Sequence, residues 1–515
     1  MRQIKSGAAA WKQIIAHVTP GGGKSALPLI AAAELIPSVA SKLCWIVPRV
    51  ALQHQAEEAF VDRTFRSFLN HKHSIRISTN QPDPSRGLCG YVTTYAALAI
   101  DTHKYNELEF KRHRYILVLD EPHHIAEDSA CMSAVKPLLE NAALILFMSG
   151  TLERGKKEKI AFLPYSMQGQ GKELEIKLSD SQHTKVISYN RPDGLAEHAI
   201  IPLRCTYLDA KAEWKDRMGN RKMVSSLREI KKLAKEALVT ALATQYAFEL
   251  LDRALADWRK IKQSSPRSKL LVVAATQKLA KKYAEHIALK HRQTVGIATM
   301  DEGAGAMKAI NKFKRVDSNK TDILVTVAMA YEGLDVKPIT HIACLTRIRS
   351  KPWIEQMMAR ATRYDPEAGP WEAQEAHVFV PDDFMMHKIL DAIAREQAPF
   401  ARRKEFGEGR EGGANRDLFG DLIPLDSGAS GTRSARLHSN KSNLKPVEAE
   451  VLTPSQKEAK LRESIDYHVR DYALRYKMAF KDVNAKMLNR FGKSRTLMTL
   501  SELERALAWV HKDLK

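Results

Sequence analysis

Two series of short apolar runs, separated by helical stretches, constrain the fold of this chain most strongly. The first series lies between Lys12 and Leu152, with the runs "QIIAHVT", "KLCWIVP", "CGYVTTY", "RYILVLDE" and "LILFMSGT". The second lies between Lys269 and Val380, with "KLLVVAAT", "QTVGIATM", "DILVTVAM", "HIACLTRI" and "AHVFVPD". These runs lack the alternation of half-exposed strands, so they are typical of parallel strands covered on both faces. We therefore expect an α/β fold with two parallel-sheet domains.

Three further segments differ from these domains in composition. The connecting segment begins polar and strand-like, and from Lys211 to Lys262 it becomes basic with helical periodicity, which predicts a helical hairpin or insert. A Gly- and Ser-rich stretch then predicts a flexible linker. The last segment regains helical periodicity with 14 Lys+Arg against 8 Asp+Glu, which predicts a small basic helical module. The expected boundaries are 1–154, 155–265, 266–400, 401–455 and 456–515.

The charge of the chain narrows the class of partner. Its 515 residues include 81 Lys+Arg and 60 Asp+Glu, a formal net charge of +21 at pH 7. Because neutralised phosphates release condensed counterions, a nucleic acid is the expected partner, and a solvated basic surface is the alternative. No run reaches the roughly 18 apolar residues of a membrane span, and no secretory signal is visible. We expect no membrane partner and a cytoplasmic location, in which the five scattered cysteines are reduced thiols.

The segment "VTPGGGKS" has the composition of a phosphate-binding loop. It lies between an expected strand and an expected helix, where glycines let backbone N–H groups surround phosphate oxygens. In that geometry Lys24 would reach the β- and γ-phosphates, and Ser25 would bind Mg²⁺. Val18 stands where the strict pattern has a glycine, so a structural glycine-rich turn is the alternative for the loop taken alone.

Two adjacent carboxylates follow the fourth apolar run. In "RYILVLDEPHHIAED", Asp120 and Glu121 come at the carboxyl end of an expected strand, the edge at which open α/β sheets bind ligands. Asp120 can hold Mg²⁺ through water, and Glu121 can take a proton from an attacking water. A solvated strand end is the alternative, but the preceding phosphate loop favours nucleotide hydrolysis. His123 and His124 complete no zinc set, because no third His or Cys stands at ligand spacing.

A third candidate element, "PWIEQMMARATRYDP", lies in the second α/β domain. Its spacing places Gln356, Arg360 and Arg363 on one face of an expected helix. Arginines there could reach a nucleotide on the first domain and stabilise charge that develops on its γ-phosphate. The alternative is a solvated basic face.

With these elements in order, residues 1–400 resemble the superfamily 2 helicases. Motif I is matched by "TPGGGKS", Ia by "IVPRVALQHQ", Ib by "YVTTYAAL" and the DExH-type motif II by "DEPH". Motif III is matched by "SGT", IV by "LLVVAAT", V by "ILVTVAMAYEGLDV" and VI by "QMMARATR". The segment "ISYNRPDGLAEHAIIPLRCTYLDA" is similar to one in restriction-enzyme translocase subunits, which favours DNA over RNA.

The resemblance implies two RecA-like domains, with ATP and Mg²⁺ between them and nucleic acid across their top. The implied nucleotide-binding residues are Gln3 (adenine), Thr19, Pro20, Gly21, Gly22, Gly23, Lys24, Ser25, Gly333 and Asp335. The implied catalytic residues are Lys24, Asp120, Glu121, Gln356, Arg360 and Arg363, and the implied metal-binding residues are Ser25 and Asp120. Ser149 and Thr151 would couple hydrolysis to strand movement, and Arg49, Thr94, Thr276 and Thr326 would lie along the nucleic-acid backbone.

The leading hypothesis is therefore an ATP-dependent DNA helicase or translocase. An ATP-switched clamp or remodeller that does not unwind, and an RNA helicase, are the alternatives. Thr19 and Pro20 stand in reversed order relative to the family's pattern, and Ala359 replaces a glycine of motif VI. The C-terminal segment faintly resembles the helical modules of phage antirepressors, which suggests a phage or mobile-element origin and a surface for a protein partner.

Overall fold

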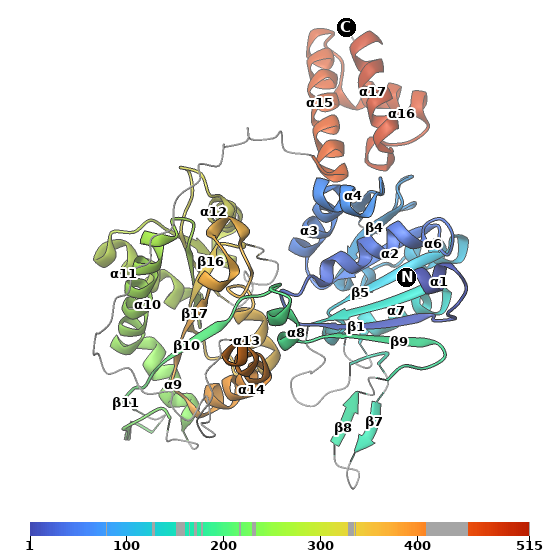
Figure 1. Cartoon of the computed structure of the whole chain (residues 1–515). Helices are drawn as coiled ribbons and strands as arrows, with labels where there is room; N and C mark the ends of the chain where they lie inside the picture. The colour runs from blue at the N-terminus through green and yellow to red at the C-terminus, as the bar shows by residue number, and fades with distance from the viewer. Residues whose placement is uncertain are drawn as a thin grey trace, which may run out of the picture. The chain divides into compact units, whose positions relative to one another are not determined.

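The computed structural model of the full chain describes residues 1–513 except 79, 126–128, 151–159, 164, 169–172, 177–178, 216–217, 229–232, 328–333, 335 and 408–451. Contacts group the chain into two compact units. Unit 1 comprises Met1–Val18, Gly23–Ser188 and Lys445–Lys515, and unit 2 comprises Thr19–Gly22 and Tyr189–Leu444. The chain therefore leaves unit 1, forms unit 2 and returns to unit 1 for its last helices (Figure 1).

Unit 1 is built on a seven-stranded sheet with the strand order β3-β4-β2-β5-β6-β1-β9. The pairs from β3 to β1 are parallel. All six residues of β5 are buried, as expected for a strand covered on both faces. The strands are β1 (Gln13–Val18), β2 (Lys42–Val47), β3 (Ile75–Ile77), β4 (Gly90–Thr94), β5 (Tyr115–Asp120), β6 (Leu144–Ser149) and β9 (Thr184–Tyr189).

Short helices connect these strands. They are α1 (Arg2–Lys5), η1 (Lys24–Ala26), α2 (Leu27–Leu35), α3 (Val50–Val61), α4 (Arg63–Leu69), α5 (Tyr95–Ala99), α6 (Tyr105–Arg112), η2 (Pro122–His124) and α7 (Ala130–Asn141). An antiparallel pair, β7 (Tyr165–Gln168) and β8 (Glu173–Ile176), precedes β9. One core of the unit joins Ile15, Tyr115 and Phe147 from three strands to Val135 and Leu138 of α7.

Unit 2 is built on a six-stranded sheet with the order β10-β17-β16-β13-β15-β14, and all five pairs are parallel. The strands are β10 (Leu203–Leu208), β13 (Lys269–Ala274), β14 (Val295–Ala298), β15 (Ile323–Val327), β16 (Ile339–Leu345) and β17 (Ala376–Pro381). The helices are α8 (Arg191–Ala196), α9 (Ala234–Ala243), α10 (Gln245–Ser264), α11 (Gln277–His291), η4 (Met300–Glu302), α12 (Ala304–Lys314), α13 (Lys351–Met358), η5 (Pro366–Ala368), η6 (Trp371–Ala373) and α14 (Phe384–Gly407). Two parallel sheets confirm the predicted α/β class.

The connecting segment differs from its prediction at its beginning. The helical periodicity assigned from Lys211 onward is wrong for residues 212–224, which form the antiparallel hairpin β11 (Ala212–Lys215) and β12 (Arg221–Val224). Gly219 lies between the two strands with a φ of +85°, and such a glycine supports a hairpin turn rather than a helix. The helical part consists of α9 and α10, which pack in one core with strand residues such as Leu270 and Val272.

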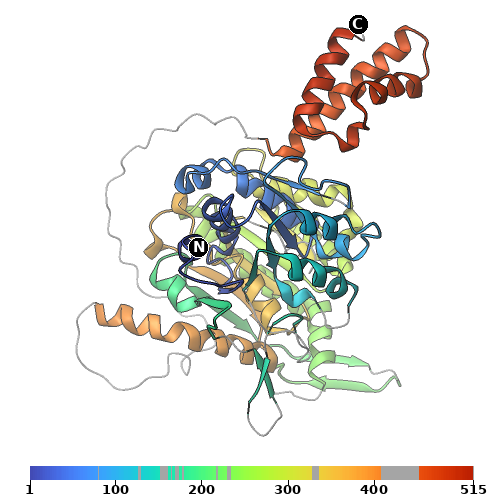
Figure 2. The same ribbon diagram turned by 90° about the vertical axis from the view of Figure 1, so that its right-hand side faces the viewer.

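The end of the chain forms the predicted helical module, called here the C-terminal module (residues 454–513). It contains α15 (Pro454–Arg475), α16 (Phe480–Phe491), η7 (Arg495–Leu497) and α17 (Leu500–Asp513), which pack around their own apolar core (Figures 1 and 2). A capping box between Thr453 and Gln456 starts α15. The predicted linker, 401–455, is wrong for residues 401–407, which continue helix α14, and its residues 408–451 lie outside the described residues. Among the described helices, none is both long and apolar enough to cross a membrane.

Candidate nucleotide-binding site

The glycine-rich loop between β1 and η1 has a backbone that side chains would disturb. Gly21 and Gly23 have φ angles of +88° and +83°, a region that other residues rarely adopt. A Cβ on Gly22 would lie 3.0 Å from both the Thr19 carbonyl oxygen and the Tyr189 ring. The loop therefore depends on its glycines for its geometry, and exposed backbone of this kind suits close approach of phosphate groups.

Lys24 meets the two predicted acidic residues directly after this loop. Its ammonium lies 3.2 Å from Oδ1 of Asp120 and contacts Oε1 of Glu121. Both carboxylates come from the end of β5 and are buried, with 5% and 8% exposure. Because buried carboxylates are unfavourable without a compensating charge, Lys24 stabilises the pair. The structure thus brings together three of the residues predicted to be catalytic.

Glu121 is held in an unfavourable backbone conformation by its neighbours. Its φ is +49°, a left-handed conformation that a residue other than glycine occupies at a cost of about 1–3 kcal/mol. Its N–H donates to the Met148 carbonyl at 2.8 Å, and the Ser149 hydroxyl donates to its Oε2 at 2.7 Å. Nδ1 of His123 lies 3.3 Å from the same oxygen. Ser149, predicted as a coupling residue, and His123, considered in the sequence only as a metal ligand, therefore both surround this carboxylate.

Asp120 and Ser25 supply oxygen atoms of the kinds that the sequence assigns to a magnesium ion. Oδ1 of Asp120 is buried and accepts no well-aligned hydrogen bond from the described residues, although the Lys24 ammonium is close. Ser25 is exposed in η1, directly after Lys24. Carboxylate and hydroxyl oxygens are among the ligands that Mg²⁺ prefers. The hydroxyl of Tyr95 donates to the Asp120 carbonyl at 2.9 Å, a supporting contact between α5 and β5 that the sequence pattern does not reveal.

In unit 2 the predicted helical face is wrong. Helix α13 ends at Met358, so Arg360 and Arg363 lie beyond it and share no helical face with Gln356. The chain leaves the helix because the following residues pair with another segment: the Ile201 N–H donates to the Thr362 carbonyl at 2.8 Å.

The two arginines still converge, by a different route. Nη1 of Arg360 and Nη1 of Arg363 each donate to the Leu334 carbonyl at 3.2 Å. Their guanidinium groups are therefore held near one point of the loop that follows β15.

The predicted nucleic-acid contacts lie mainly at helix starts. Arg49, Thr94 and Thr276 are the N-caps of α3, α5 and α11, and helix N-termini favour bound anions. The hydroxyls of Thr94 and Thr276 accept from backbone N–H groups of their own helices. Thr326 is fully buried in β15, and its hydroxyl donates to the Ala298 carbonyl at 2.9 Å.

The other predicted site residues are not brought into this cluster. Gln3 is exposed on α1, and Thr151, Gly333 and Asp335 lie outside the described residues.

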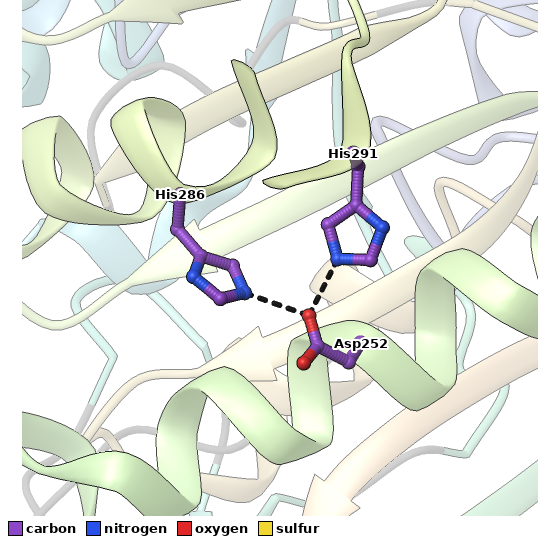
Figure 3. Close-up of side chains that lie close together, drawn as sticks. All are labelled: Asp252, His286 and His291. Carbon is purple, nitrogen blue, oxygen red and sulfur yellow. Dashed lines mark hydrogen bonds and ion pairs between the residues drawn. The ribbon is translucent and has the colours of Figure 1, made fainter. Parts of the chain in front are cut away.

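Unit 2 also contains a cluster of Asp252, His286 and His291 that resembles a metal site. Figure 3 shows both imidazole rings directed at Oδ1 of Asp252, with Nε2 distances of 2.7 and 2.5 Å. Ligands held 2.0–2.1 Å from a tetrahedral zinc ion lie roughly 3.3 Å apart, which is longer than these distances. The ammonium of Lys290 also donates to Oδ2 of Asp252 at 2.7 Å. The cluster is therefore a hydrogen-bonded ion-pair network that joins α10 to α11.

Comparisons with known proteins agree with the sequence motifs. Residues 2–154 match the family "Type III restriction enzyme, res subunit", and residues 247–365 match the "Helicase conserved C-terminal domain". An uncharacterized protein of Mycobacterium leprae (strain TN) is 24% identical over 386 residues, which covers 73% of this chain and 60% of that protein. An uncharacterized protein of Mycobacterium tuberculosis (strain ATCC 25618 / H37Rv) is 23% identical over 392 residues, 74% of this chain and 60% of that protein. The chain thus spans about 60% of the length of these curated relatives.

Among solved structures, the fragment structure of a putative HsdR subunit of a type I restriction enzyme from Vibrio vulnificus YJ016 is similar. Its TM-score is 0.46 and its identity 12%, with 73% of this chain and 60% of that chain covered.

Proposed function

This chain belongs to the superfamily 2 helicases related to restriction-enzyme translocases, and on that premise we propose that it is an ATP-dependent DNA helicase or translocase. The observation that carries the proposal is the cluster of Lys24, Asp120 and Glu121 beside the glycine-rich loop. An ammonium, a metal-binding carboxylate and a second carboxylate in one buried place are what hydrolysis of a nucleoside triphosphate requires.

Each residue of the cluster has a role that its contacts support. Lys24 would exchange its contact with Glu121 for nucleotide phosphates, which would leave the Glu121 carboxylate able to take a proton from water. Ser25 and Asp120 would hold Mg²⁺, which neutralises charge on the phosphates when bound. The Ser149 hydroxyl donates a hydrogen bond to the Glu121 carboxylate, which would gain a proton during hydrolysis. A change in this hydrogen bond would then couple hydrolysis to movement of other parts of unit 1.

DNA is proposed as the substrate on two grounds. The net charge of +21 suits a polyanion, and the family matched by residues 2–154 is named for a restriction enzyme. Backbone contacts fix a strand without reading its sequence, so we expect little base specificity. An RNA helicase, or an ATP-switched clamp that does not unwind, is the second candidate, because the cluster supports hydrolysis without specifying what hydrolysis moves.

The test compares ATP hydrolysis without nucleic acid and with single-stranded DNA, duplex DNA, forked DNA and RNA, while displacement of a labelled strand is followed. A DNA motor shows DNA-stimulated hydrolysis, whereas stimulation by RNA alone, or hydrolysis with neither displacement nor translocation, supports the second candidate.

Glu121→Gln should retain ATP binding and lower hydrolysis by about 10²–10⁴-fold. Glu107→Gln, a carboxylate on α6 in the same unit, is the matched control. Unchanged turnover in Glu121→Gln would refute the role of Glu121 as the base.

A further inference from the structure

The C-terminal module is attached to unit 1 through a buried ion-pair cluster. Glu458 of α15 is 2% exposed, and its oxygens accept hydrogen bonds from Arg76 of β3, both at 3.1 Å, and from Arg86 at 2.9 Å. The two arginines are 6% and 4% exposed. Burial and the neighbouring Arg76 lower the pKa of Arg86 to about 10, so it stays charged at neutral pH. Because a buried charge without a partner is strongly destabilising, the cluster fixes the module on the sheet edge.

A second buried carboxylate holds the start of the same helix. Glu57 of α3 is fully buried, and its oxygens accept from the Ser455 N–H at 2.8 Å and the Thr453 hydroxyl at 2.9 Å. The Ile77 N–H of β3 donates to the Ser455 hydroxyl at 3.2 Å. The module is therefore held by α3 and β3 together, rather than only by its covalent linker.

One of the elements that hold the module, α3, also begins at a predicted nucleic-acid contact of unit 1. Helix α3 begins directly after Arg49, and Glu57 lies two turns further, about 10 Å along the axis. In the loop after β3, Asn80 donates to the Ala97 carbonyl of α5 at 2.6 Å, and α5 is the helix that Thr94 caps. The module thus contacts α3 directly, whereas α5 is bonded to the loop after β3 and not to the module itself.

The turn between α15 and α16 exposes apolar and basic side chains together. Tyr476 is 55% exposed and Phe480 38%, and the Arg470 guanidinium lies over the Phe480 ring at 5.7 Å. Lys477 and Lys481 are exposed beside them. We call this set the distal surface; it consists of Arg470, Tyr476, Lys477, Phe480, Lys481 and Lys486.

The charge of the module argues for a polyanionic partner. Of its 8 acidic residues, Glu458, Asp466, Asp471 and Glu502 already contact arginine or lysine side chains. Its 13 basic residues outnumber the 8 acidic ones, so the module carries a net positive charge. Exposed aromatic rings within a basic surface are the combination that binds single-stranded nucleic acid, since bases stack on the rings and phosphates contact the cations.

We propose that the C-terminal module is an arm fixed to unit 1 that binds single-stranded nucleic acid on its distal surface. The proposal rests on the proposed function, because it assigns to the same motor a second contact with its substrate. The arm would move with the domain that holds Lys24 and Glu121, since its anchors lie in the same unit.

The test measures binding of a labelled single-stranded DNA by the full chain over a series of salt concentrations. Tyr476→Ala/Phe480→Ala should weaken binding by about 5- to 100-fold with little change in the salt dependence, because stacking is lost and charge is kept. Lys477→Glu/Lys481→Glu should weaken binding and lower the slope of log K against log salt by about 1–2. Lys457→Glu/Lys460→Glu, exposed on the first turns of α15, makes the same charge change and should keep wild-type affinity within about twofold.

Wild-type affinity for DNA in both distal variants would refute the proposal that the distal surface binds single-stranded nucleic acid. The distal surface would then be assigned to a protein partner. An equal loss in the Lys457→Glu/Lys460→Glu control would also overturn the proposal, because general charge would then account for the binding. ATP hydrolysis by the wild-type chain separates this failure from that of the proposed function. If DNA stimulates ATP hydrolysis by the wild-type chain while the distal variants bind DNA normally, the proposed function is supported and the arm is refuted. If it neither binds nor responds to DNA, the proposed function itself fails.

Discussion

Ser149, the predicted coupling residue, contacts the carboxylate of Glu121 from the neighbouring strand. It ends β6, and its hydroxyl donates to Oε2 of Glu121 at 2.7 Å. We predict that Ser149→Ala lowers strand displacement per ATP hydrolysed by at least about tenfold, while hydrolysis itself falls less than in Glu121→Gln. The ratio of the two rates, measured on one DNA substrate, checks this. Ser38→Ala, an exposed serine of the same unit, should leave the ratio unchanged. A proportional fall of both rates would assign Ser149 to catalysis rather than coupling.

Arg363 allows a second prediction at the same scale. Its guanidinium and that of Arg360 both donate to the Leu334 carbonyl, so both are held in position before any nucleotide contact. We predict that Arg363→Ala lowers kcat for ATP hydrolysis by about 10³–10⁵-fold, with much less effect on ATP affinity. Arg315→Ala, whose side chain pairs with Asp317 on the surface of unit 2, is the control. Equal losses of rate and affinity would indicate a binding role instead.

At the scale of elements, the sequence predicts correctly those helices and strands whose pattern is set by residues close together in the chain. The buried parallel strands are short apolar runs because both faces are covered, so their pattern is visible locally. The end of α13 was missed because the pairing of Ile201 with Thr362 decides it, and those residues are far apart in sequence. The anchoring of the module was missed for the same reason: Arg76 and Glu458 are 382 residues apart, and each alone reads as a surface charge.

Helix α10 is fixed to the sheet of unit 2 by a carboxylate that depends on pH. Hydrogen bonds from His341 and His377 hold the pKa of Asp257 well below its usual range. The ionised carboxylate therefore stabilises the fold above about pH 4, and this contribution is lost as the pH falls below that value. Burial lowers the pKa of His341 in the folded chain. As the pH falls, the unfolded chain therefore protonates this histidine at a higher pH than the folded chain does. Lowering the pH below about 6.5 thus also destabilises the fold.

We predict that Asp257→Asn reduces the local stability of α10 at pH 7 by about 1 kcal/mol. Its difference from the wild type should shrink below about pH 4. Hydrogen exchange of peptides from α10, corrected for the intrinsic rate at each pH, measures both effects. Asp301→Asn, an exposed carboxylate in η4, should exchange like the wild type. A constant difference across the pH range would mean that Asp257 acts through packing rather than through its charge.

At the scale of the whole molecule, the last residues of the chain belong to unit 1, which allows a prediction about cleavage of the linker. If Glu458, Arg76 and Arg86 hold the module in place, the peptide link between residues 407 and 454 is not what keeps it there. A site-specific protease sequence inserted near residue 430 would separate residues 1–430 from the module. We predict that the two fragments co-elute in size-exclusion chromatography after complete cleavage.

The buried ion pairs decide that outcome, so one substitution should reverse it. Glu458→Gln leaves Arg76 and Arg86 buried without a compensating charge, a loss of about 3–5 kcal/mol where such pairs have been broken. After cleavage, this variant should release the module, whereas Glu463→Gln, exposed on the same helix, should retain it. Uncleaved Glu458→Gln should keep its helical circular dichroism, because the module has its own core in Ile465, Val469 and Leu503. Release of the module from the cleaved wild type would mean that only the linker holds it. The module would then not be an arm fixed to unit 1.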